Sequence, residues 1–217
     1  MTLAELNAKM KIGVARPDLT ADNDDDYSAY LNDAQREICR LYSFNWMRTS
    51  TSVTILAGTS SIALPTNFKE LTTDVSPVHE VDDSSGSEVY TPVAVWTPEK
   101  VKRWQRSTVL SGSVPAVYVD QTTSPQSLSI GTITATESRE FQVSYFKFLD
   151  DLDSDADTNK LTDDYPQMLL HKAKALAFGD INDEAMVEFH EGLFTVKFLQ
   201  AKKHDSYARV AGQNLHM

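Results

Sequence analysis

The sequence predicts an α+β protein in which helices from the two ends of the chain form a bundle, with a small antiparallel β domain inserted between them in the chain and a flexible C-terminal tail. Apolar residues recur every three or four positions near both ends, which is typical of amphipathic helices. Between these regions, short runs rich in threonine and valine alternate with turn-forming residues. We therefore expect a helical bundle from 1–48 and 149–204, a β-rich insert at 49–148 and a flexible C-terminal tail at 205–217.

Two helices are expected at the N-terminal end. Leu3, Leu6 and Met10 share one face of a short helix that Gly13 closes. A cluster of aspartates at 22–26 then places negative charge where a helix start carries unsatisfied N–H groups and partial positive charge. The second helix has an apolar stripe made of Tyr27, Tyr30, Leu31, Ala34, Ile38 and Leu41.

Short strands are expected in the middle of the chain. Runs at 51–56 and 60–64 flank Ala57-Gly58-Thr59 and favour a β-hairpin with glycine at its turn. One helix interrupts the strands, because Thr97 is a good N-cap and Pro98 suits the first helical position, and it should run to Ser107. Further strands are predicted at 74–81, 88–95, 114–120, 127–134 and 141–148.

The C-terminal third starts with an acidic segment, 149–164, which holds seven aspartates and one lysine and predicts a solvated loop. Pro166 then begins a helix, and a second helix is expected at about 183–203. These two helices should form a hairpin that packs on the N-terminal one. Residues beyond 205 include few apolar side chains and should form a mobile tail. The apolar side of the last helix should consist of Met186, Phe189, Leu193, Val196 and Leu199.

The composition argues against several classes of protein. The 217 residues include 20 Lys and Arg against 31 Asp and Glu, a net charge of −11, which disfavours tight binding of a polyanion over a broad surface. Cys39 is the single cysteine, so an intrachain disulfide and a four-cysteine zinc site are excluded, and a buried structural thiol is expected. No signal-peptide pattern or bilayer-spanning apolar run is present, so we expect a soluble, cytoplasmic protein with no membrane partner.

The sequence contains no complete catalytic or metal-binding motif. His190 begins a zinc-protease spacing, but Phe194 stands where the second histidine ligand is required. The alternating aspartates at 151–159 resemble the start of a calcium loop, yet Ala156 replaces the turn glycine and Thr162 the bidentate acid. No glycine-rich phosphate loop is present. We therefore assign no catalytic residue, metal or cofactor, and a hydrolase with a cleft between the insert and the helices has no recognisable support.

The internal helix carries a basic cluster whose role has two interpretations. Basic residues around an aromatic ring can hold nucleic acid through phosphate contacts and stacking. Alternatively, Val101 and Trp104 cover the sheet, and the basic side chains are solvated or paired with an acidic neighbour, which is the interpretation we favour. The basic residues are Lys100, Lys102, Arg103 and Arg106.

Several local motifs follow one another in an order that is familiar. Residues 30–38 form a helical segment that leads to the aromatic exit Phe44-Asn45-Trp46. Thr97-Pro98-Glu99, the spaced Gly112, Pro115 and Tyr118, the strand Tyr145-Phe146-Lys147 and the helix start Tyr165-Pro166 come later. Between them, a pattern V-x-x-x-A-G-x-x-x-x-x-L-P-x-x-F-x-x-L is matched by Val53, Ala57, Gly58, Leu64, Pro65, Phe68 and Leu71.

Over residues 25–203, this order resembles the head-to-tail adaptor (connector or neck) proteins of tailed bacteriophages. One departure lies at 128–134, where many members have an L-x-L-x-P-x-P turn that this chain lacks. The resemblance implies a structural virion protein rather than an enzyme, made in the host bacterial cytoplasm and located in the neck of the particle. Members form a ring, usually a dodecamer, below the portal and above a tail or nozzle protein. Genome DNA passes through the ring during ejection without specific binding.

The resemblance also implies that the C-terminal segment docks on the portal and becomes ordered only on assembly. The hypothetical docking residues are Lys202, Lys203, Tyr207, Arg209, Val210 and Leu215.

A second hypothesis concerns contacts between subunits. The acidic segment faces either the lumen, where like charge keeps DNA centred, or the basic helix of a neighbouring subunit. A chaperone or binding module for another phage structural protein, absent from the finished particle, is the alternative function. The inter-subunit candidates are Lys100, Lys102, Arg103, Arg106, Asp151, Asp153, Asp155 and Asp157.

Overall fold

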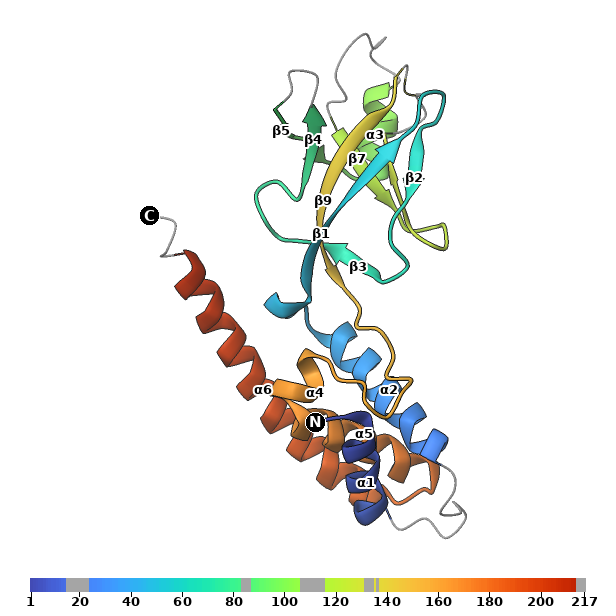
Figure 1. Cartoon of the computed structure of the whole chain (residues 1–217), viewed down its shortest axis with the longest axis vertical. Coiled ribbons are helices and arrows are strands. Elements are labelled where there is room, and N and C mark those ends of the chain that lie inside the picture. The colour runs from blue at the N-terminus through green and yellow to red at the C-terminus, as the bar shows by residue number, and fades with distance from the viewer. Residues whose placement is uncertain (15–23, 83–86, 106–115, 131–134, 136, 214–217) are drawn as a thin grey trace. The chain divides into compact units, whose positions relative to one another are not determined.

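A computed structural model of the chain describes residues 1–14, 24–82, 87–105, 116–130, 135 and 137–213. Over these ranges the protein is of mixed α and β structure, with six α-helices and largely antiparallel sheets, so the expected α+β class is confirmed. The chain divides into two compact units, one formed by Met1–Met47 with Phe148–Met217 and the other by Arg48–Lys147 (Figure 1). Each unit has its own buried side chains and is described separately.

The first unit contains five of the helices. Helix α5 (Pro166–Asp180) packs along α6 (Glu184–Gln213) and against α2 (Asp24–Leu41). Helix α1 (Leu3–Gly13) packs on α2 and α5, and the short α4 (Lys160–Asp164) directly precedes α5 (Figure 1). The fully buried core includes Leu6, Met10, Leu31, Ile38, Cys39, Leu161, Met168 and Leu169.

The helix starts in this unit follow from their capping residues. Thr2 and Glu5 form a capping box at α1, and Asn159 with Thr162 forms one at α4. Pro166 occupies the first turn of α5, where a missing N–H costs nothing. The carboxylate of Asp183 accepts the Met186 N–H at the start of α6. These ends agree with the sequence-based expectations for α1, α5 and α6.

The second unit contains two sheets. One has the order β1 (Arg48–Ile55), β9 (Arg139–Lys147), β4 (Val78–Asp82) and β5 (Val89–Pro92), and β3 (Phe68–Leu71) also pairs with β9. The other has the order β2 (Ser61–Ala63), β8 (Ser127–Ser129), β7 (Ala116–Asp120) and β6 (Ala94–Val95). Every pairing is antiparallel except β6 with β7, which is parallel. Helix α3 (Pro98–Gln105) connects these two strands.

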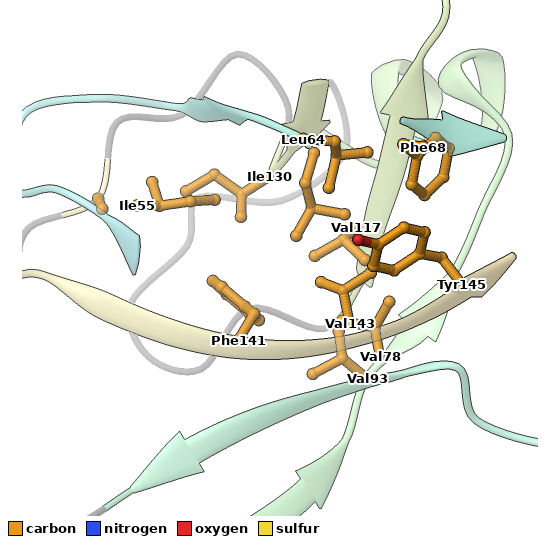
Figure 2. Close-up of a cluster of buried hydrophobic side chains, with 12 residues drawn as sticks. Ile55, Leu64, Phe68, Val78, Val93, Val117, Ile130, Phe141, Val143 and Tyr145 are labelled. Carbon is orange, nitrogen blue, oxygen red and sulfur yellow. The ribbon is translucent and has the colours of Figure 1, made fainter. Parts of the chain in front are cut away.

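Side chains from both sheets form the core of the second unit. Alternate residues of β9, Phe141, Val143 and Tyr145, point into it and meet side chains such as Val78 of β4 and Val117 of β7 (Figure 2). Strand β9 pairs with three other strands, and it supplies two of the three aromatic side chains of this core, Phe141 and Tyr145. This alternation is the period of two that a half-buried strand requires.

The expected hairpin of 51–56 and 60–64 is wrong in its pairing, although its turn is present. Gly58 has a φ of +83°, and the Thr59 N–H donates to the Leu56 carbonyl at 3.0 Å. However, β1 pairs with β9 and β2 pairs with β8, so the two strands enter different sheets. Strand β9 offers β1 eight partner residues, whereas β2 has only three residues to offer. The long-range pairing therefore replaces the local one.

The flexible tail expected at 205–217 is also wrong over most of its length. Helix α6 continues to Gln213, and only 214–217 lie outside the described residues. Alanine, lysine and arginine, which have high helix propensity, are frequent between 201 and 211. Asp205 is also 5% exposed and bound to another part of the unit, so the helix has a reason to continue.

The structure differs from the expected elements in two smaller ways. Strand β3 and helix α4 had no counterpart among the expected elements. The run expected as one strand at 88–95 is two strands of different sheets, separated at Val93. The parts of the expected strands at 114–115 and 131–134 lie outside the described residues.

Candidate assembly surface

The outer face of α6 carries four large, exposed apolar side chains. Phe189, Val196, Leu199 and Tyr207 are 56%, 52%, 59% and 63% exposed. Gly192 and Lys203 are exposed between them. At 100° per residue these six positions fall within roughly 80° of the helix circumference. We call Phe189, Gly192, Val196, Leu199, Lys203 and Tyr207 the α6 stripe.

The exposure of the α6 stripe shows that the expected orientation of the last helix is wrong. Phe189, Val196 and Leu199 were expected on the side that packs against the bundle, but they face outward. The packed side instead carries His190, Phe194 and Ala201, which are 6%, 5% and 1% exposed. Helix α6 therefore has two apolar faces, and only one of them is covered within the unit.

Aromatic contacts fix the inner face of α6. The Phe198 ring lies 6.0 Å from the Phe44 ring and 6.5 Å from the Tyr42 ring, in edge-to-face geometry at both. Phe44 in turn stacks on Trp46 with ring centroids 5.2 Å apart. The ammonium of Lys202 lies 4.9 Å from the centre of the Tyr42 ring, within cation–π range. The aromatic exit after α2 is thus the platform on which α6 rests.

A buried carboxylate continues this contact further along α6. Asp205 accepts the backbone N–H of Asn45 at 2.6 Å and the hydroxyl of Tyr42 at 3.3 Å. Asn45 is the first residue of the 3₁₀ turn η1 (Asn45–Met47), so Asp205 satisfies an N–H that the turn itself leaves unbonded. This contact anchors the C-terminal half of α6 to the turn that follows α2.

The expected docking residues occupy different environments on α6. Lys202 is half-buried against the aromatic platform, whereas Lys203 and Tyr207 are exposed on the α6 stripe. The Lys203 ammonium lies 5.9 Å from the centre of the Tyr207 ring. Arg209 and Val210 belong to the last turns of α6, and Leu215 lies outside the described residues.

The acidic segment is not the free solvated loop that its composition suggested. Asn32 holds Leu152 by two hydrogen bonds, of 2.8 and 3.2 Å, between its side-chain amide and the Leu152 backbone. Gln35 donates to the Asp150 carbonyl at 2.8 Å. The carbonyls of Asp155 and Asp157 accept N–H groups from the first turn of α1. The segment therefore joins α1 to α2 through its backbone.

Two of the four acidic candidates are also used within the chain. Asp151 forms an ion pair with Arg36, and this hydrogen bond raises the pKa of the guanidinium. Asp157 accepts the backbone N–H groups of Ser154 and Asp153, which lower the pKa of its carboxyl below the ordinary value. Asp153 and Asp155 have exposed side chains.

The basic helix α3 starts as expected, and Val101 of its expected inner face is buried, whereas the side chain of Trp104 and the expected end at Ser107 lie outside what the structure describes. The Thr97 hydroxyl accepts the Lys100 N–H at 3.3 Å, and Val101 is 1% exposed. The Lys100 ammonium lies 4.3 Å from the centre of the Trp96 ring, and Arg103 is exposed. Lys102 lies within α3, whereas Arg106 is outside the described residues.

One pair of titratable groups was not expected from the sequence. His171 of α5 and His190 of α6 have their Nδ1 atoms 3.1 Å apart, and the His190 ring stacks on Phe178. Burial lowers the pKa of both imidazoles. The sequence held no signal for this pair, because the predicted apolar side of the last helix did not include His190. Among the residues that the structure describes, no three His, Cys, Asp or Glu side chains are grouped as a metal site.

Comparison with known proteins identifies the family. Within the described ranges, no helix combines the length and the hydrophobicity that a membrane span requires. No curated protein matches the chain closely enough to count as a relative. The model of the SU10 adaptor protein family matches residues 1–214, almost the whole chain. The resemblance to phage head-to-tail adaptors is thereby confirmed, and the chain belongs to the SU10 adaptor protein family.

Proposed function

We propose that this chain is the structural subunit of a ring, a dodecamer by the family resemblance, that lies beneath the portal and connects the capsid to the tail. The observation that carries the proposal is the family match over residues 1–214. The α6 stripe supports it, because contiguous exposed apolar side chains are typical of a surface that another protein covers. A phage adaptor is a structural component of the virion, so no catalytic role is assigned.

In this proposal the C-terminal half of α6 docks on the portal. Tyr207 supplies an exposed aromatic ring, a residue type that is enriched at interfaces, and Lys203 supplies an exposed cation beside it. Arg209, Val210 and Leu215 continue the chain toward the end that docks. Because α6 is already helical to Gln213, docking requires less ordering of the chain than a flexible tail would.

The acidic charge has a role in the same ring. A channel wall that bound phosphates tightly would retard DNA, whereas a net negative subunit repels it, and a net charge of −11 fits the second case. In the proposed contact between α3 of one subunit and the acidic segment of the next, the acidic partners are Asp153 and Asp155. Asp151 and Asp157 are engaged in their own chain and are less available.

Two measurements test the function. Mass spectrometry of purified virions should find the chain in a constant, stoichiometric ratio to the portal protein. Electron microscopy of the purified chain mixed with its portal should show a ring on one end of the portal. A chain that binds another structural protein during assembly but is absent from finished particles would be a chaperone instead, and the adaptor proposal would then be wrong.

A further inference from the structure

The α6 stripe has the spacing of a coiled-coil seam. Its positions follow one another in steps of three or four residues, and four of the six carry large apolar side chains that are more than half exposed. Gly192 stands in the middle of the helix, where glycine lowers helix stability. A Cβ atom added at Gly192 would meet nothing within 4 Å. Packing inside the chain therefore gives no reason for a glycine at this position.

We propose that α6 of the unassembled protein pairs antiparallel with α6 of a second copy. The stripe is complementary to itself when one copy is turned end for end about a point between Lys197 and Phe198. Val196 then lies opposite Leu199 of the second copy, and Tyr207 lies one residue beyond the position opposite Phe189. Gly192 lies opposite Lys203, the one charged residue of the stripe, whose alkyl stem needs the space that glycine leaves.

The charges along α6 favour this direction of pairing. Its first half carries Glu184, Glu188 and Glu191 against Lys197, and its second half carries Lys202, Lys203 and Arg209 against Asp205. An antiparallel pair brings the acidic half of each helix beside the basic half of the other. Glu188 then lies one turn from Gly192, the position opposite Lys203 of the second copy. A parallel pair would instead place Lys203 against Lys203. The occupant that fits the stripe is therefore a second copy in the reverse direction.

The pair should be weak and reversible. The stripe from Phe189 to Tyr207 is only about 27 Å long at 1.5 Å per residue, and a single helix face covers less area than stable dimers bury. The pairing concerns the free protein and does not rest on the proposed ring. Its test contains no portal, so its failure and that of the proposed function are distinguishable.

Sedimentation velocity of the full chain over a wide concentration range provides the first test. We expect a monomer–dimer equilibrium, in which Leu199→Glu raises the dissociation constant by about tenfold or more. The matched control is Val75→Glu, an equally conspicuous exposed apolar residue of the other unit, which should leave the constant unchanged. Circular dichroism confirms that both variants fold. A chain that is monomeric throughout, or whose association both variants alter equally, overturns the proposal.

Gly192 and Lys203 test the register. Gly192→Gln should raise the thermal stability of the monomer, because glutamine favours the helix. The same substitution should weaken the dimer, because the glutamine side chain fills the space that Lys203 of the second copy occupies. Lys203→Glu should weaken the dimer, and adding Glu188→Lys should restore it. If Gly192→Gln strengthens the dimer, or the charge swap gives no recovery, the register is wrong.

Disulfide cross-linking tests the direction. Cysteine-substituted chains Phe189→Cys and Tyr207→Cys, when mixed and oxidised, should form a disulfide-linked heterodimer. Either variant alone should form far less, because equal positions lie about 27 Å apart in an antiparallel pair. Efficient homodimers of Tyr207→Cys with no heterodimer would indicate a parallel arrangement and overturn the proposal. Native Cys39 is buried and should not contribute.

Discussion

Asp205 lies on the inner face of α6, where its carboxylate accepts the Asn45 N–H at 2.6 Å and the Tyr42 hydroxyl at 3.3 Å. Asp205→Ala removes a carboxylate that is itself 5% exposed and that accepts a hydrogen bond from each of these two donors. We expect a loss of about 1–3 kcal/mol in the free energy of unfolding, measured by urea denaturation.

Two variants control the Asp205 experiment. Asp205→Asn keeps an acceptor oxygen of the same size and should lose less stability than Asp205→Ala. Ser206→Ala changes the exposed neighbour, whose hydroxyl donates to the Lys202 carbonyl of the same helix, and should have little effect. If Ser206→Ala costs as much as Asp205→Ala, the loss of stability does not come from the contact between Asp205 and Asn45.

The histidine pair predicts a dependence of stability on pH. Burial lowers the pKa of His171 and His190 below the ordinary value of 6.5, and Lys174 lowers both further. As the pH falls through 6.5, the unfolded chain therefore takes up protons before the folded one, so folding becomes less favourable. The contribution of the pair should be complete well above pH 6.5 and should decline below it.

Urea denaturation between about pH 7.5 and 5.5 measures this decline. Carboxylates also titrate near the lower limit, so the relevant quantity is the difference between the wild type and a His171→Gln, His190→Leu variant. The variant should lose less stability than the wild type over this range, whereas the exposed His204→Gln should behave like the wild type. Equal slopes for all three chains would show that the pair is not coupled to folding.

At the level of the elements, the sequence predicts what depends on local spacing. Helices α1, α2 and α5 and most strands lie where apolar periodicity and capping residues placed them. The partner of β1 could not be predicted in this way, because β9 begins at Arg139, far along the chain. The extension of α6 depends on Asp205 and Asn45, which are distant in sequence, so composition alone indicated a mobile tail.

The α6 stripe could be predicted only in part, because local spacing shows which residues share a helical face but not which face is buried. Spacing placed Phe189, Val196 and Leu199 correctly on one helical face. It could not show which face is buried, because α6 has a second apolar face that includes Phe194 and Phe198. The platform that selects the inner face, Tyr42 and Phe44, belongs to a segment with no helical period. A second apolar face on one long helix is the signal that could have indicated an assembly surface.

Because Asp205 anchors α6, its position determines where a truncation that tests docking should be made. A cut after His204 would also remove Asp205 and disturb the bundle, so the cut belongs after Ser206. The truncated chain should keep its folded structure by circular dichroism, lose little stability and fail to bind the portal in a pull-down. A matched full-length variant, Tyr207→Ser, should bind more weakly than the wild type. Undiminished binding by the truncated chain would refute docking through this end of α6.

At the scale of the whole molecule, the charge of −11 is unevenly distributed. Seven aspartates lie between 149 and 164, whereas α3 and the second half of α6 are locally basic. The backbone of the acidic segment is held by α1 and α2, so its exposed carboxylates have a defined position. A fixed acidic patch and a basic helix on one subunit can satisfy each other in a closed ring, because every subunit presents both.

This arrangement predicts that ring assembly depends on charge pairing between subunits. Each exposed ion pair contributes only about 0–1 kcal/mol, but in a ring the contact is repeated at every interface. Asp153→Lys combined with Asp155→Lys should therefore reduce the fraction of rings seen by electron microscopy at low salt, and less so at high salt, where screening has already weakened the contact. Glu140→Lys, an exposed acid of β9, changes one charge outside the segment and should have a smaller effect. Adding Arg103→Glu to the double variant should restore assembly in part, because the reversed charges again attract. Full ring formation by the double variant at low salt would place the contact elsewhere and leave the acidic segment with the lumen as its proposed environment.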